Sequence, residues 1–219
     1  MDDAADRELD LLAEQLTRMR GMLFGYSDLF FRRIRDWGVL TIALLVLGST
    51  QIAPAAVVVV PFLVPFAFLE TAYLFFYTIF ARRHAEYLER AINARFGHDV
   101  LIAHRLEAVY FYPPEAPKVA ALSLGDPLGM MSASTIGYTV AAGLLWAAGM
   151  AGTISFAAAS GGLVGALPII AIAWTVSVAA YLVWDSLTRR AENRLVAELE
   201  RGYLAPVESG ARPAGPGSD

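Results

Sequence analysis

The sequence has no cysteine, only one lysine, and two long stretches that are almost free of charge. Without cysteine, disulfide bonds and thiolate metal sites are excluded. The Walker-type phosphate loop and the HExxH and GxSxG motifs are also missing, which removes the main signatures of nucleotide hydrolases, zinc proteases and α/β-hydrolases. The arginines border the apolar stretches and are interleaved with acids, which argues against nucleic-acid binding. We therefore predict no catalytic residue and no cofactor.

The two charge-poor stretches define the class of protein. Between Trp37 and Phe80 the only charged side chain is Glu70, and residues 137–184 contain none. The stretches have 44 and 48 residues, whereas one helix needs about 20 apolar residues to cross a bilayer. Each is therefore long enough for two passes. We predict an all-α integral membrane protein with four transmembrane helices arranged as two helical hairpins, flanked by amphipathic cytoplasmic helices.

The predicted segments follow from the positions of turn formers and charges. Residues 205–219 are rich in proline, glycine and serine, which is typical of a disordered tail. The full division is a cytoplasmic or interfacial helix over 1–36, hairpin 1 over 37–80 (spans about 37–53 and 55–80), a cytoplasmic loop over 81–136 with a helix over 82–96, hairpin 2 over 137–184 (spans about 136–154 and 163–184), a cytoplasmic helix over 185–204 and the tail.

Orientation follows from the basic residues. All 17 lysines and arginines lie in residues 1–36, 82–118 and 189–212, and the hairpin tips at 48–54 and 155–162 carry no charge. Basic residues beside spans mark the cytoplasmic side, so both termini and the central loop are predicted to be cytoplasmic. Arginine outnumbers lysine sixteen to one, which indicates a GC-rich bacterial gene. We therefore predict a multi-pass protein of the bacterial inner membrane, with lipids as partners.

Two patterns suggest helix association. An apolar seam of alternating three- and four-residue spacing runs along the first 24 residues, at Leu9, Leu12, Leu16, Met19 and Leu23. It either joins a partner or a second copy, or packs on the protein's own cytoplasmic face. The predicted third span is crowded with glycine and alanine, which lets helices approach closely. It therefore forms either a tight second hairpin or an oligomer contact.

Glu70 is the one candidate functional residue inside a span. It lies about eleven residues from the predicted cytoplasmic end, or about 16 Å along a helix, which is near the bilayer midplane. An ionised acid there costs about 2.5–3.5 kcal/mol, and no span contains a basic residue to pair with it. Tyr73 and Tyr77 share its helix face. This face either lines a polar pathway for a proton, ion or polar group, or holds a neutral acid that serves packing only.

Four polar residues of the central loop resemble metal ligands, namely His98, Asp99, His104 and Glu107. On a helix, residues 104 and 107 share a face, but residue 98 does not align with them, and a zinc site needs convergent ligands. We interpret them as surface residues and predict no metal site. Residues 100–112 around them form either an interfacial helix or a strand.

Three functions are considered on these grounds. The leading hypothesis is a non-enzymatic membrane protein that acts through self-assembly or a partner complex. The alternative is a small transporter or channel that uses the Glu70, Tyr73 and Tyr77 face. The third is a membrane enzyme that acts on lipid, which would need convergent polar groups that the sequence does not show.

Overall fold

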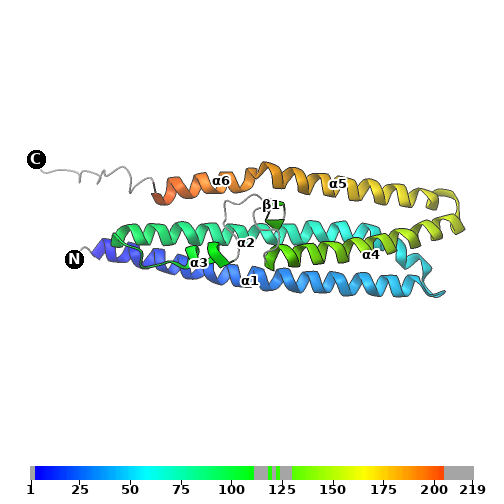
Figure 1. Ribbon diagram of the computed structural model, residues 1–219, viewed down its shortest axis with the longest axis horizontal. Coiled ribbons are helices and arrows are strands. Elements are labelled where there is room, and N and C mark those ends of the chain that lie inside the picture. Colours follow the sequence, from blue (N-terminus) through cyan, green and yellow to red (C-terminus); the bar gives the residue numbers. More distant parts are fainter. Residues whose placement is uncertain (1–2, 111–117, 120–121, 124–129, 205–219) are drawn as a thin grey trace, which may run out of the picture. The chain divides into compact units, whose positions relative to one another are not determined.

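The computed structural model describes residues 3–110, 118–119, 122–123 and 130–204, and nearly all of these are helical (Figure 1). The predicted all-helical class is therefore confirmed, with one short antiparallel pair, β1 (Lys118–Val119) and β2 (Leu122–Ser123), inside the predicted loop. The predicted tail, 205–219, lies outside the described residues. Two compact units divide the chain: the first holds Met1–Gly25, Tyr77–Pro114 and Arg189–Asp219, and the second holds Tyr26–Phe76 and Glu115–Thr188.

Three of the described helical segments are long and apolar enough to cross a membrane: Pro54–Phe96, Ala133–Ser160 and Gly162–Tyr203. Their length and composition support the predicted transmembrane class. The predicted first span does not reach this standard, because α1 (Asp3–Gly48) ends at Gly48 and its apolar part begins at Trp37. That leaves twelve helical residues, or about 18 Å, against a hydrocarbon core of about 30 Å.

The helix α1 is continuous from Asp3 to Gly48, with no break where the cytoplasmic helix was predicted to give way to the first span. Its sequence contains no proline, and the arginines in the middle of it are good helix formers. At Gly48 the chain turns so tightly that a Cβ atom would lie 2.7 Å from the Cβ atom of Val57. The end of the helix therefore requires glycine.

Two prolines shape the start of the next helix. The 3₁₀ helix η1 (Pro54–Val59) passes into α2 (Val60–Phe96) just before Pro61, and Pro65 lies inside α2. Pro61 has no amide hydrogen to donate to the carbonyl of Val57, and the amide of Val60 donates to that carbonyl instead. The two prolines therefore lie at and just after a change from 3₁₀ to α geometry. Gly97, at φ +70°, ends α2 at the predicted stop.

In the second unit, α4 (Met130–Ser160) and α5 (Leu167–Thr188) form an antiparallel hairpin joined through η2 (Gly162–Ala166) (Figure 1). The helix α4 begins at Met130, inside the predicted loop 81–136 and ahead of the predicted third span. A Cβ atom on Gly149 or Gly152 would clash with a valine of the η1–α2 segment, Val60 or Val57 respectively. Small residues here let the backbones approach closely.

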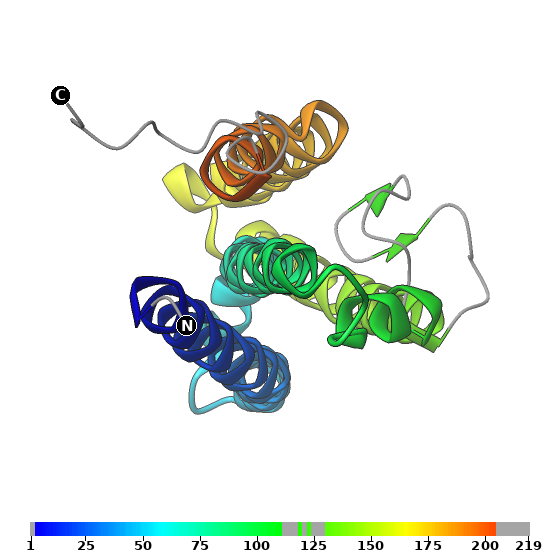
Figure 2. The same ribbon diagram turned by 90° about the vertical axis from the view of Figure 1, so that its left-hand side faces the viewer.

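In the first unit, α2 lies between the first turns of α1 and α6 (Arg190–Leu199), as Figure 2 shows. Arg189, with a left-handed φ of 45°, separates α6 from α5, and η3 (Glu200–Leu204) follows α6. Residues 100–112 were predicted to form either a helix or a strand, and Ala103–Tyr110 of this range form the helix α3. Met19 is buried against Ala85 and Leu88 of α2, and Leu12 and Leu16 pack around this cluster. The N-terminal seam therefore packs on the protein's own helices.

Candidate functional site

Glu70 has two partners from α1 in the second unit. The indole Nε1 of Trp37 donates a hydrogen bond to Oε2 of Glu70, and Nε of Arg33 lies 3.5 Å from Oε1. The sequence did not predict this ion pair, because Arg33 lies just outside the predicted first span. Arg33 and Trp37 are one helical turn apart, and antiparallel packing of α1 on α2 places that turn opposite Glu70. The Trp37 ring also meets Phe66 edge-on, with centroids 5.8 Å apart.

The two tyrosines that share the face of Glu70 differ in their surroundings. Tyr73 belongs to the second unit and is 57% exposed, whereas Tyr77 is half-buried and falls in the first unit. The side chain of Glu70 is itself 27% exposed. A polar pathway along these three residues stays a prediction.

The level of Glu70 along its helix can be read from contacts between α2 and α5. The indole Nε1 of Trp174 on α5 donates to the carbonyl of Phe62 on α2 at 3.1 Å. Both helices run away from their turns in the same direction and rise equally per residue. Residue 70 of α2 and residue 182 of α5 each lie eight residues beyond this contact. Glu70 is therefore level with the α5 turn that carries Tyr181 and Trp184.

Contacts with α4 give the same level. Gly149 abuts Val60, and the two helices are antiparallel. Glu70 on α2 and Thr139 on α4 each lie ten residues from this contact, so they are at the same level. Tyr138 is the neighbour of Thr139. Aromatic side chains from α1, α4 and α5 thus stand at the level of Glu70. We call this set the aromatic belt: Trp37, Tyr138, Tyr181 and Trp184.

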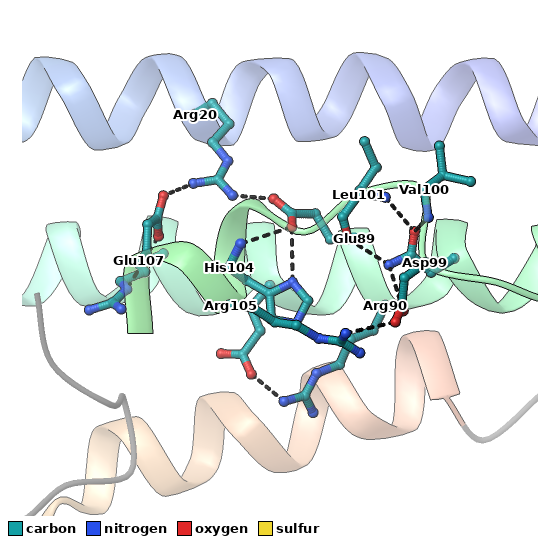
Figure 3. A network of polar contacts seen from close by, with 12 residues as sticks. Arg20, Glu89, Arg90, Asp99, Val100, Leu101, His104, Arg105 and Glu107 are labelled. Atoms are coloured by element: carbon teal, nitrogen blue, oxygen red, sulfur yellow. Dashed lines mark hydrogen bonds and ion pairs between the residues drawn. The ribbon is translucent and has the colours of Figure 1, made fainter. Parts of the chain in front are cut away.

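A second polar group lies in the first unit and is centred on Glu89 (Figure 3). Glu89 is 1% exposed and accepts hydrogen bonds from Arg20 of α1 and from His104 of α3. His104 donates its backbone amide at 3.0 Å, and its Nδ1 lies 2.9 Å from the same oxygen, Oε2. Glu107, one turn along α3, pairs with Arg20 and with Nε of Arg82 at 3.4 Å. Three helices are therefore joined by one charged cluster.

The two carboxylates of the cluster, Glu89 and Glu107, stabilise the positive charge of Arg20. Burial alone would lower the pKa of Arg20, but hydrogen bonds to Glu89 and Glu107 and the charges of both carboxylates outweigh it and raise that pKa above its ordinary value. Arg20 therefore stays charged in the fold. A buried charge that lost these partners would be strongly destabilising.

Asn93 of α2 sets the path of the chain into α3. Its Oδ1 accepts from the amides of Val100 and Leu101 at 3.0 and 2.8 Å, and its Nδ2 donates to the Leu101 carbonyl at 2.7 Å. A buried side chain that satisfies three backbone groups replaces the hydrogen bonds that an irregular segment lacks. This clamp positions His104 for Glu89.

The four residues that resemble metal ligands go to different partners. His104 meets Glu89, Glu107 meets two arginines, Asp99 pairs with Arg105 at 2.7 Å, and the Nδ1 of His98 lies 2.9 Å from the carbonyl of Phe96. Within the described residues no group of three or more histidines and acids is placed to hold a metal ion. Of the four, His104 and Glu107 join α3 to the neighbouring helices, whereas His98 and Asp99 make exposed local contacts.

Sequence reasoning missed Glu89 and Arg20. They lie 69 residues apart, and each resembles an ordinary charged residue of an exposed helix face. One signal was present: Glu86, Glu89 and Asn93 recur at helical spacing between apolar residues of α2. A polar stripe inside an apolar helix indicates partners from other helices.

Comparisons of the chain with protein-family models, with curated proteins and with solved structures found no match. The function therefore has to be argued from the geometry described above.

Proposed function

We propose that the protein is a four-span protein of the bacterial inner membrane, with both termini in the cytoplasm, and that it acts without catalysis by assembling with copies of itself. The contact between copies uses the face of α4 that is exposed in the described part of the chain.

The proposed bilayer boundary is the aromatic belt. Tryptophan, tyrosine and arginine favour the region between hydrocarbon and water, and the belt lies level with Glu70 and Arg33. At this depth an ion pair costs less than at the midplane. From Glu70 to Pro54 the chain has ten α-helical and six 3₁₀ residues, a rise of about 27 Å. This nearly equals the hydrocarbon thickness of about 30 Å.

The short first span fits this boundary. From Trp37 in the aromatic belt to its end at Gly48, α1 rises about 18 Å. Residues 49–53 complete the crossing up to Pro54. The basic residues on the other side of the belt, Arg32, Arg33 and Arg35, support a cytoplasmic N-terminus. The first hairpin therefore crosses the membrane as a helix plus a turn, and the chain has four passes.

The observation that carries the proposal is that α4 has two small-residue faces, of which the described residues cover only one. On the inner face, Gly149 and Gly152 touch the η1–α2 segment so closely that a Cβ atom would clash. On the outer face, Gly143, Ala147 and Ala151 recur every four residues, and all three are exposed. Small residues at this spacing let helices associate in lipid, where there is no hydrophobic force between them.

The other helix of this hairpin, α5, also has most of its apolar surface exposed. Only 11% of the most apolar window of the segment Gly162–Tyr203 is buried within the chain, against 28% for Pro54–Phe96. The second hairpin therefore presents most of its surface to its surroundings. A second copy on the outer face of α4 covers small residues that lipid chains contact poorly.

The state of Glu70 favours assembly over transport. A residue that carries protons or ions must exchange its partner freely, whereas Glu70 is held by an arginine and an indole from α1. This pairing fits a role in locking α1 to α2. Glu89, which is buried and held by Arg20 and His104, is likewise committed to the fold.

Cysteine cross-linking in native membranes tests the contact, because the chain has no cysteine of its own. We expect Ala147→Cys to form a disulfide-linked dimer on mild oxidation. Val176→Cys is the matched control, since it is 61% exposed and stands at a similar level on α5. Equal cross-linking at both positions would indicate random collision, and no dimer at position 147 or at its neighbours 143 and 151 would refute the proposed face.

A further inference from the structure

The end of the described chain is held in the first unit by a polar contact. Tyr203 of η3 packs beside the buried cluster of Met19, Ala85 and Leu88. Its hydroxyl lies 2.7 Å from Nε2 of His84 on α2. The amide nitrogen of Gln15 on α1 lies 3.3 Å from the same ring nitrogen. The His84 ring therefore joins α1, α2 and η3.

The other nitrogen of this ring, Nδ1, is out of contact with solvent. Nδ1 of His84 is buried and has no hydrogen-bond partner among the residues that the structure describes. Among the described residues, the groups that face the ring are Gln15 from α1, Tyr203 from η3 and the Phe80 ring of α2, whose centroid lies 5.7 Å from that of the His84 ring. None of these is a carboxylate.

The nearest acid of η3 is engaged elsewhere. Oε1 of Glu200 accepts from the hydroxyl of Tyr87 at 3.1 Å. In the protonated ring both nitrogens carry a hydrogen, and the N–H of Nδ1 would have no acceptor among the described residues. The added positive charge would also have no carboxylate beside it among the described groups that face the ring. Both are unfavourable in a buried environment. In water both N–H groups of the ring are hydrated.

We propose that His84 is an acid-sensitive latch: when its ring takes up a proton, Tyr203 and the η3 segment are released from α1 and α2. The ring is neutral in the docked state and protonated in the released state. Docking is therefore complete at pH values well above the ordinary imidazole pKa of about 6.5. It weakens as the pH falls below that value, by up to tenfold per pH unit for one proton. The latch is independent of the contact between copies proposed above.

The test is the mobility of a spin label on full-length protein between pH 5 and 8. The label is placed by Gly202→Cys, because a Cβ atom there meets nothing within 4 Å in the described structure. We expect the label to become mobile below about pH 6.5. A label at the exposed residue Ala94, in the same unit, should show no change. No transition at position 202, or an equal transition at position 94, would overturn the latch.

Substitutions assign the transition to His84. His84→Gln cannot titrate and should abolish the pH dependence. His104→Gln should retain it, since the chain has only three histidines and His98 is exposed. A transition that persists in His84→Gln, or disappears in His104→Gln, would contradict the proposal.

A second variant covers the case in which His84→Gln leaves the segment mobile at every pH. Gln15→Glu places a carboxylate beside Nε2 and gives the protonated ring a partner in the docked state. We expect it to lower the midpoint of release by about one pH unit, a tenfold gain in proton affinity of the docked ring. An unchanged or raised midpoint would overturn the latch.

Discussion

Replacing Glu89 with glutamine removes the anion at the centre of the first unit while keeping the shape of the side chain. The carboxylate accepts from three donors, namely a guanidinium group of Arg20 and the backbone and ring nitrogens of His104. The amide of glutamine keeps one acceptor oxygen and points an NH₂ group at a donor. Arg20 and His104 then compete for the remaining oxygen.

The size of the effect follows from this geometry. A hydrogen bond to a charged group contributes about 1.5–3 kcal/mol, and breaking a buried ion pair costs about 3–5 kcal/mol. Glu89 is 1% exposed, so little of this is lost to solvent screening. We expect Glu89→Gln to lower the free energy of opening the first unit by about 3 kcal/mol.

Hydrogen exchange of the backbone amides measures this opening free energy in detergent or nanodiscs. Amides of α2 around Glu89 should exchange about a hundredfold faster in the variant, the rate equivalent of about 3 kcal/mol. Glu198→Gln is the matched control, because its carboxylate is 67% exposed and pairs with Arg201 on the surface; it should change the free energy by less than about 1 kcal/mol. An equal, small effect of both substitutions would refute the account of the cluster.

Three further substitutions compare the inner with the outer face of α4 and test the role of Glu70. Gly149→Ala forces a methyl group against Val60 and should destabilise the second unit by about 1–3 kcal/mol in thermal unfolding. Gly143→Ala is the control and should not destabilise this unit, because a Cβ atom there meets nothing within 4 Å in the described structure. Equal losses of stability in the two variants would contradict the close packing at Gly149. Glu70→Gln keeps a group that can accept from Trp37 but removes the charge facing Arg33, so it should cost about 1 kcal/mol or less of hairpin stability at this half-exposed pair. It should leave ion flux in reconstituted vesicles unchanged, and a loss of flux would support the transport alternative instead.

The helices could be predicted from the sequence where the evidence is local. Apolar runs of sufficient length predicted α2, α4 and α5, and the helix predicted over 82–96 ends where α2 ends. The continuity of α1 through its charged middle could not be predicted, because a change from apolar to charged residues marks a change of solvent and not of backbone conformation. The apolar part of α1 looked like a full span because residues 49–53, which follow Gly48, carry no charge either.

The polar contacts could not be predicted, because they depend on the register between helices. Arg33 lies outside the apolar stretch that contains Glu70, so a search for partners within the spans passes over it. Only the antiparallel register of α1 and α2 brings the two residues together. Arg20 and Glu89 raise the same difficulty in the first unit, since each is one of many charged residues on its helix and only the packed structure selects the pair.

The central claim, self-assembly through the outer face of α4, is tested most directly by counting copies in a bilayer. A single fluorophore is attached to each chain at an introduced cysteine, and photobleaching steps are counted in nanodiscs or vesicles at low protein density. We predict that most particles contain two or more copies. Ala147→Trp, which fills the small-residue face, should reduce them to one copy, and Val176→Trp on α5 should not. Single copies in the unsubstituted protein, or assemblies that survive Ala147→Trp unchanged, would contradict the account.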